Sequence, residues 1–135
     1  MRLLLDTTAL SEPMRKLPDP GFMARLARVP SADLFTSSVC VMELRYGCAL
    51  KKDAGLWKRI AREILAAVQI LPFGEAEAQR CGDVLAALSK SGEPIGVEDS
   101  QIAATALVHG LVVVTANVKH FRRISGLAVE NWLAH

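Results

Sequence analysis

The stretch "RLLLDTTALSE", residues 2–12, decides the fold and raises a question of chemistry. Its three leucines, Leu3–Leu5, predict a short buried strand, because fully apolar strands are typical of parallel sheets covered on both faces. The strand stops at Asp6, although a carboxylate is costly to bury without a partner. The segment from Thr7 to about Lys16 predicts a helix. Since Asp is a favoured N-cap residue, Asp6 is either a helix cap or part of a functional site.

The composition indicates one globular domain over residues 1–135. Of the 135 residues, 51% are hydrophobic and 22% are charged, which excludes an intrinsically disordered chain. The net charge of +2 permits nucleic-acid binding but does not require it. Because only 5% of the residues are aromatic, a binding surface of stacked aromatic side chains is not expected.

The cysteines and the N-terminus indicate a reduced, cytoplasmic protein. Cys40, Cys48 and Cys81 form an odd set with neither a CxxC spacing nor a nearby histidine cluster, so we expect neither a disulfide framework nor a zinc site. The first apolar run ends at Asp6 and is too short for a signal peptide. No apolar stretch is long enough to span a bilayer.

Helices and short apolar strands alternate along the rest of the chain. Further strands are expected at 34–36, at 111–115 ("LVVVT") and at 127–131. Hydrophobic periodicity and capping residues predict helices at 22–29, 39–50, 55–68, 74–92 and 97–110. The helix at 39–50 is apolar on most sides, and we expect it to be largely buried. Apolar strands joined by helices predict an α/β fold, a three-layer α/β/α sandwich with a short, mainly parallel sheet.

Polar side chains follow the predicted strands. Asp6 ends the first strand, Thr115 ends the 111–115 strand, and Asn117 comes just beyond it. Glu43 lies in the helix that leaves the second strand, and Asp99 begins the helix that leads into the 111–115 strand. Ligands of open parallel sheets bind at the carboxyl ends of the strands, so we expect these side chains to converge there.

Three carboxylates close together repel one another unless a cation compensates them. Carboxylate, hydroxyl and amide oxygens favour Mg²⁺ or Mn²⁺, which can activate water for attack on phosphorus. Each acid also has a purely structural interpretation. Asp6 is a possible N-cap, Glu43 a possible ion-pair partner of Arg2 or Arg45, and Asp99 a possible partner of the helix N-terminus.

Four blocks of the sequence, in this order, resemble the PIN-domain ribonucleases, and in particular the VapC-type toxins of bacterial toxin–antitoxin pairs. They are "LLLDTTALSE" (3–12), "SSVCVMELRYG" (37–47), "PIGVEDSQIAATAL" (94–107) and "VVVTANVKHFRRISGLAVENW" (112–132). The resemblance covers essentially the whole chain.

The resemblance implies an α/β/α sandwich, a homodimer, Mg²⁺- or Mn²⁺-dependent endonucleolytic cleavage of a structured RNA such as tRNA or rRNA, and a cognate antitoxin that blocks the site. Carried over by position, Asp6, Glu43 and Asp99 match the family's catalytic, metal-binding acids. Thr115 matches its strand-end hydroxyl and Asn117 its following polar residue.

Two positions depart from the family pattern. Thr8 stands where the family often has Asn, and His120 stands where it often has a fourth acid. An imidazole does not replace a carboxylate as a Mg²⁺ ligand, so we expect a second metal to bind weakly or only together with a substrate phosphate. We expect Thr7 and His120 to support the site or to contact RNA, together with the basic residues of "KHFRR" (119–123).

Two other functions fit some of these residues. In an aspartyl-phosphate phosphatase, Asp6 would be the nucleophile, but a second acid is usual two residues later, where this chain has Thr8. In a non-catalytic RNA-binding module, the acids would bind a structural cation.

Overall fold

The computed structural model describes residues 1–133 and contains a five-stranded sheet in the order β3-β2-β1-β4-β5. All four strand pairings are parallel. The strands are β1 (Leu3–Leu5), β2 (Leu34–Ser37), β3 (Gln69–Leu71), β4 (Val112–Val114) and β5 (Val129–Glu130). The α-helices are α1 (Thr7–Ser11), α2 (Pro20–Arg28), α3 (Ser38–Leu50), α4 (Ala54–Glu63), α5 (Glu75–Ser91), α6 (Val97–His109) and α7 (Val118–Phe121).

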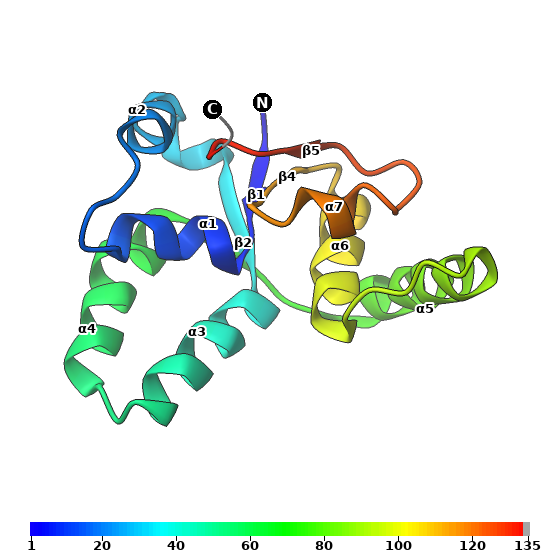
Figure 1. Ribbon diagram of the computed structural model, residues 1–135, viewed down its shortest axis with the longest axis horizontal. Helices are drawn as coiled ribbons and strands as arrows, with labels where there is room; N and C mark the ends of the chain where they lie inside the picture. The colour runs from blue at the N-terminus through cyan, green and yellow to red at the C-terminus, as the bar shows by residue number, and fades with distance from the viewer. Residues whose placement is uncertain (134–135) are drawn as a thin grey trace.

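Helices cover the sheet from two sides. In Figure 1, α1, α3 and α4 lie to the left of β1 and β2, whereas α5 and α6 lie to the right. The first turns of α1 and α3 leave the lower ends of β1 and β2 in this view (Figure 1). The predicted α/β class with a parallel sheet is therefore confirmed.

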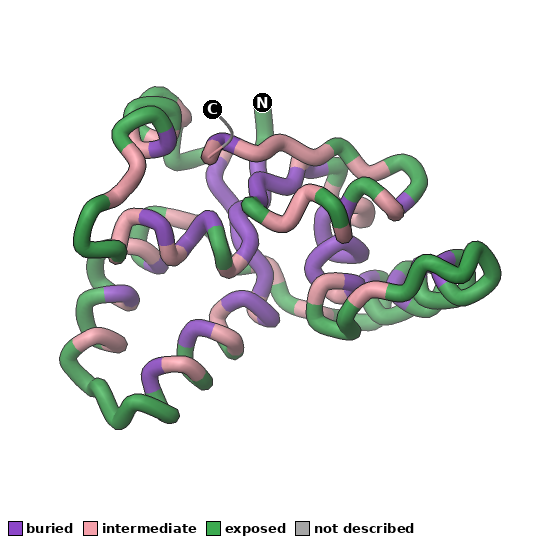
Figure 2. The backbone as a smooth tube through the Cα atoms, in the orientation of Figure 1, coloured by how far each residue is buried: buried purple, intermediate pink, exposed green. Residues whose placement is uncertain are grey.

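The middle strands form the centre of the core. Leu4 in β1 and Val113 in β4 are both 0% exposed, and Figure 2 shows the buried class concentrated on these strands while α5 is exposed along most of its length. β1 and β4 are neighbours, with Leu5 beside Val114. The strand order reverses at this pair, because β2 and β3 extend the sheet to one side and β5 extends it to the other. Such a reversal opens a crevice at the carboxyl ends of the two strands.

The first helix is shorter than the sequence pattern indicates. We expected it to reach about Lys16, but α1 ends at Ser11 and a 3₁₀ turn, Glu12–Met14, follows. Pro13 explains the difference, because proline has no N–H to donate and its ring clashes with the preceding turn of an α-helix.

The second helix begins two residues earlier than expected. Asp19 caps it by accepting a hydrogen bond from the Phe22 backbone N–H at 2.8 Å, and Pro20 occupies its first turn. A proline in the first helical turn is favourable because the N–H that it lacks has no partner there in any case.

The segment expected as one helix at 55–68 is divided. α4 ends at Glu63, and a 3₁₀ turn at Leu65–Ala67 brings Leu65 into the core. The apolar piece that follows pairs with β2 as the edge strand β3, which the sequence did not separate from a loop.

The expectation that α3 is largely buried was wrong. Only one stripe of the helix packs on the core, formed by Val39, Cys40, Leu44 and Cys48. Met42, Tyr46 and Leu50 lie on another face at spacings of four residues and are 49%, 62% and 66% exposed. The apolar composition of α3 therefore predicts more contact between this helix and the rest of the chain than the structure shows.

Truncating the central strand should destabilise the whole domain. Leu4→Ala removes a fully buried side chain and leaves a cavity between the helical layers, so we expect the free energy of unfolding to fall by about 2–5 kcal/mol. Leu17→Ala is the matched control, because Leu17 is 83% exposed. Its effect should stay within about 0.5 kcal/mol. Urea denaturation followed by circular dichroism measures both, and equal effects would contradict the packing described.

Candidate active site

Asp6 directly follows β1, at the carboxyl end of the β1–β4 pair. Its backbone N–H donates to the Val114 carbonyl at 3.1 Å, which extends the parallel ladder by one bond. One carboxylate oxygen, Oδ1, accepts the Ala9 backbone N–H at 3.0 Å, so Asp6 is the N-cap of α1. The capping interpretation is therefore correct, although it accounts for only part of the side chain's environment.

Two hydroxyl groups hold the rest of the Asp6 carboxylate. Thr8 Oγ1 donates to Oδ1 at 2.6 Å, and Thr115 Oγ1 donates to Oδ2 at 2.5 Å. Each hydroxyl also accepts a backbone N–H, Thr8 from Ala116 and Thr115 from Asn117. These bonds join the start of α1 to the segment that follows β4. The sequence analysis did not predict the hydrogen bond from Thr8 to Asp6. The sequence contains a signal for it, because Thr8 carries a hydroxyl two residues after an acid at the end of a strand.

The surroundings of Asp6 disfavour the ionised form of its carboxylate. Its side chain is buried, the residue being 3% exposed, and burial raises the pKa of the carboxyl above its ordinary value. The hydrogen bonds from Thr115, Thr8 and Ala9 lower the pKa, whereas the negative charge of Asp99 raises it further. Asp6 and Asp99 are thus close enough to interact electrostatically.

Asp99 belongs to the same hydrogen-bond network. It lies in the first turn of α6, where a negative charge is favourable at a helix N-terminus. Its Oδ2 is 3.3 Å from Asn117 Nδ2 and 3.2 Å from His120 Nδ1. Because the Asn117 backbone also donates to Thr115, a continuous path of hydrogen bonds runs from Asp6 through Thr115 and Asn117 to Asp99.

Glu43 approaches from α3 and contacts the same end of α1. Its Oε1 accepts a hydrogen bond from Thr7 Oγ1 at 2.5 Å, and the residue is half-buried. The cations considered as ion-pair partners face other groups. Arg2 lies over the Phe35 ring and donates to the His109 carbonyl, whereas Arg45 lies over the Trp57 ring.

Cys40 lies behind this site and is fully buried. Burial raises the pKa of its thiol to about 11, against hydrogen bonds with Thr36 and Thr7 that lower it. A thiol with so high a pKa is neutral at physiological pH, so Cys40 is a core residue and not a nucleophile. All three cysteines are free, as the sequence predicted.

The donor set fits a hydrated divalent cation. Within residues 1–133, no group of three or more His, Cys, Asp or Glu side chains lies close enough to hold one metal ion. Mg²⁺ does not need such a group, because it keeps several waters and is typically bound through one or two carboxylates. Asp6 and Asp99, whose charges disfavour one another, supply carboxylates to a cluster that also contains hydroxyl and amide groups.

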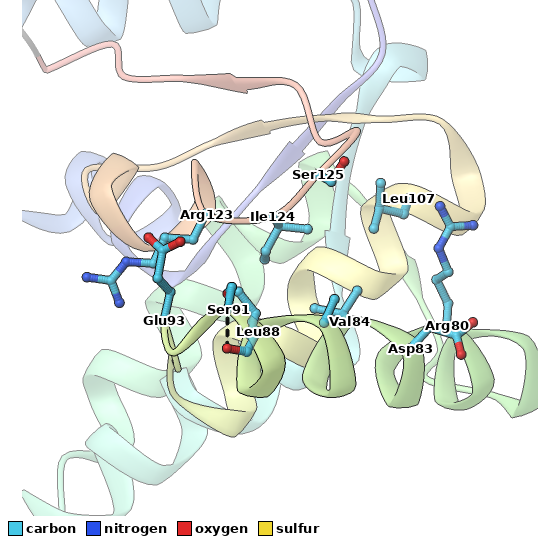
Figure 3. A pocket seen from close by; sticks show the side chains of 11 residues that line it. Arg80, Asp83, Val84, Leu88, Ser91, Glu93, Leu107, Arg123, Ile124 and Ser125 are labelled. Atoms are coloured by element: carbon cyan, nitrogen blue, oxygen red, sulfur yellow. Dashed lines mark hydrogen bonds between the residues drawn. The ribbon is translucent and has the colours of Figure 1, made fainter.

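A separate cleft of about 350 Å³ lies between α5, α6 and the turn after α7. Figure 3 shows an apolar floor that includes Val84 and Leu88, with Arg123 near Glu93 at one end and Arg80 near Asp83 at the other. Because each end carries one positive and one negative side chain, this cleft has no net charge that would attract a phosphate. The acids after the strands therefore remain the candidate active site.

None of the helices within residues 1–133 combines the length and the apolar character needed to cross a membrane.

Replacing Thr115 with valine, which removes the hydroxyl, should destabilise the protein more than replacing it with serine, which removes only the methyl group. Thr115→Val keeps the shape but leaves Asp6 Oδ2 and the Asn117 N–H without this partner in a buried site, which should lower the free energy of unfolding by about 1–3 kcal/mol. Thr115→Ser keeps the hydroxyl and should lose less. Urea denaturation at neutral pH compares them, and equal losses would show that the hydroxyl does not hold Asp6.

Comparison with known proteins identifies the family to which this chain belongs. The PIN domain family model matches residues 3–127. The toxin FitB of Neisseria gonorrhoeae is 37% identical over 125 residues, which is 88% of this chain and 90% of FitB. The tRNA(fMet)-specific endonuclease VapC of Shigella flexneri is 33% identical over 132 residues, 98% of either protein.

Solved structures show the same fold. FitAcB from Neisseria gonorrhoeae superposes with a TM-score of 0.89 at 34% identity, covering 98% of this chain and 99% of that one. VapBC2 from Rickettsia felis, bound to a DNA fragment, superposes with a TM-score of 0.87 at 28% identity, with 98% and 99% covered. Asp6, Glu43 and Asp99 thus lie in a chain that belongs to the PIN-domain family and, within it, to the VapC-type toxins.

Proposed function

We propose that this VapC-type toxin is an endoribonuclease that uses a divalent cation, Mg²⁺ or Mn²⁺, to cleave a structured RNA such as tRNA or rRNA. One observation carries the proposal. A single hydrogen-bond network joins Asp6 and Asp99, from two distant segments, beside the strand pair at which the strand order reverses. Membership in the VapC-type family supports the ribonuclease activity, and the three acids support the dependence on a cation.

The chain's own residues have distinct tasks in this proposal. Asp6, Glu43 and Asp99 hold the cation, in part through water, and are the catalytic acids. Thr115 orients the Asp6 carboxylate, while Asn117 orients Asp99. A divalent cation bound there supplies the Lewis acidity that activates water and stabilises negative charge on the scissile phosphate. Thr7 sets the position of Glu43 through their hydrogen bond.

The substrate class is suggested by the relatives and by local charge. The Shigella flexneri relative is named as a tRNA(fMet)-specific endonuclease, which supports a structured RNA. Lys119 and Arg122 are exposed on and beside α7, next to the site, and can neutralise RNA phosphates. Arg123 is already engaged with the Pro94 carbonyl at 2.9 Å, so it is a weaker candidate for this contact.

Regulation by a cognate antitoxin follows from the same family. The VapBC2 structure from Rickettsia felis, at 28% identity, supports an antitoxin partner. A homodimer and a cytoplasmic location are further parts of the proposal, and both rest on the resemblance to this family.

The geometry disfavours the phosphatase alternative. The aspartyl-phosphate class usually has a second acid two residues after the nucleophile, whereas this chain has Thr8 there, and Thr8 Oγ1 donates to Asp6 Oδ1 at 2.6 Å. An RNA-binding module without catalysis would keep the fold and the cation but would not cleave RNA, so an activity measurement distinguishes it from the proposal.

Cleavage of RNA should require both the cation and Asp99. We expect antitoxin-free protein to cut a discrete site in total tRNA or rRNA with Mg²⁺ or Mn²⁺, and to lose this activity in EDTA. Asp99→Asn keeps the size of the side chain but removes its charge, and the cleavage rate should fall by about 100-fold or more.

Asp83→Asn is the matched control, because Asp83 is an exposed acid of α5 that lines the separate cleft. It should cleave at the rate of the unmodified protein. Equal cleavage by the Asp99→Asn protein, or cleavage that continues in EDTA, would contradict the proposed function.

A further inference from the structure

A groove of about 310 Å³ lies between α1, α3 and α4 and begins at the candidate active site. α1 and α3 diverge from the ends of β1 and β2, and α4 lines the groove from the third side (Figure 1). Thr7 and Glu43, which are joined by a hydrogen bond, are both part of its lining. The groove therefore leads directly away from one of the proposed catalytic acids.

Two rows of residues run along the groove. They recur every four residues and are Thr7, Ser11 and Arg15 on α1 and the turn after it, and Glu43, Gly47 and Lys51 on α3 and directly after it. Residues four apart lie on the same face of a helix. Each row starts at the hydrogen bond between Thr7 and Glu43 and ends at a basic residue. Because each helical residue adds about 1.5 Å, Lys51 lies about 12 Å along α3 from Glu43.

Gly47 leaves the middle of the α3 row open. A Cβ atom added there would meet no atom within 4 Å outside the adjacent backbone. Glycine inside a helix lowers stability, because the unfolded chain has more backbone freedom to lose. At Gly47 neither a positive φ nor a close contact requires a glycine. The missing side chain therefore provides room in the groove and serves no need of the fold.

The lining between the two rows is apolar. Met14 and Leu56 are half-buried there, and Leu44 and Ile60 contribute buried side chains. A base that has left its stack can pack against such side chains, and proteins that recognise single-stranded RNA bind splayed-out bases in this way. The volume is near the lower limit of small-molecule pockets, which is about 300 Å³. The groove thus suits one nucleotide better than a helix of a protein partner.

The end of the groove that lies away from Glu43 is basic. Lys51 is exposed, and none of the ion pairs formed within residues 1–133 involves it. Arg15 pairs with the buried Glu12 through Nη1 at 3.2 Å, but its side chain is 64% exposed, so its other N–H groups can donate to a phosphate. Lys16 and Lys52 follow these residues and are also exposed. Positive charge beside an apolar lining matches the phosphates and bases of single-stranded RNA.

We propose that the groove between α1, α3 and α4 is the subsite for an unstacked nucleotide next to the scissile phosphate. The base packs on the apolar lining beside Gly47, and the phosphate that follows it lies at Lys51 and Arg15. The inference rests on the proposed nuclease function and deepens it, because it gives the path of the RNA away from the catalytic acids.

The direct test is filter binding of total tRNA to the full-length Asp99→Asn protein, which should leave the RNA uncut. Gly47→Leu, added to this protein, fills the groove without changing any charge. The dissociation constant should therefore rise by about tenfold, while its dependence on salt stays the same. Lys51→Gln removes one phosphate contact, so the slope of log affinity against log salt, measured between about 50 and 200 mM NaCl, should become shallower by about 0.7.

Two matched controls separate the groove from general effects. Gly82 is an exposed glycine inside α5 where an added Cβ would also meet open space, and Arg28 is an exposed cation of α2 that shares a different cavity with Met1 and Leu3. Gly82→Leu and Arg28→Gln should change neither the affinity nor the slope. Gly47→Ala should raise the midpoint of urea denaturation, as Gly82→Ala does, and yet weaken tRNA binding. A loss of binding in a more stable protein does not come from unfolding.

An unchanged dissociation constant in Gly47→Leu, or an unchanged slope in Lys51→Gln, would overturn the inference and leave the groove to a protein partner such as the antitoxin. Because binding is measured without cleavage, the two proposals can fail separately. If the unmodified protein cuts no RNA but both variants bind tRNA as expected, the nuclease function fails and the groove stands as an RNA-binding site. If RNA is cut and both variants bind tRNA like the Asp99→Asn protein, the nuclease function stands and the groove inference fails.

Discussion

The burial of the Asp6 carboxylate at the end of a central strand is the constraint on which the site depends. Burial and the nearby charge of Asp99 both disfavour the ionised form, and only three hydrogen bonds oppose them. Two of these donors are side chains that also accept backbone N–H groups, so the carboxylate fixes the start of α1 and the segment after β4 together. The residue that caps the first helix thereby also forms one wall of the candidate active site.

A structural role and a functional role thus coincide in one side chain. An N-cap alone needs a single acceptor, and Asn provides it as well as Asp. The second oxygen, held by Thr115 and linked through Asn117 to Asp99, adds nothing to capping. Local rules are often violated at functional sites, and retaining two mutually repelling acids in one hydrogen-bond network is such a violation.

The sequence predicted those parts of the fold that local patterns determine. The apolar runs at Leu3–Leu5, 34–36 and 111–115 predicted the three central strands. The expectation that Asp6, at the end of a strand, and Asp99, at the start of a helix, converge agrees with the hydrogen-bond network that links them. Three features depended on tertiary contacts. The edge strand β3 is recognisable only by its pairing with β2, and the exposed stripe of α3 depends on what packs against it. The contact of His120 with Asp99 joins segments that are 21 residues apart.

The Asp6→Asn variant tests the central claim most directly, because Asn caps a helix as well as Asp but carries no charge. Urea denaturation without divalent cations and RNA cleavage with them should be measured on the same preparation. The account predicts a free energy of unfolding that is unchanged within about 0.5 kcal/mol or higher, together with loss of cleavage. Cleavage at the rate of the unmodified protein by a folded Asp6→Asn protein would contradict the account, because the site would then not need the charge of Asp6.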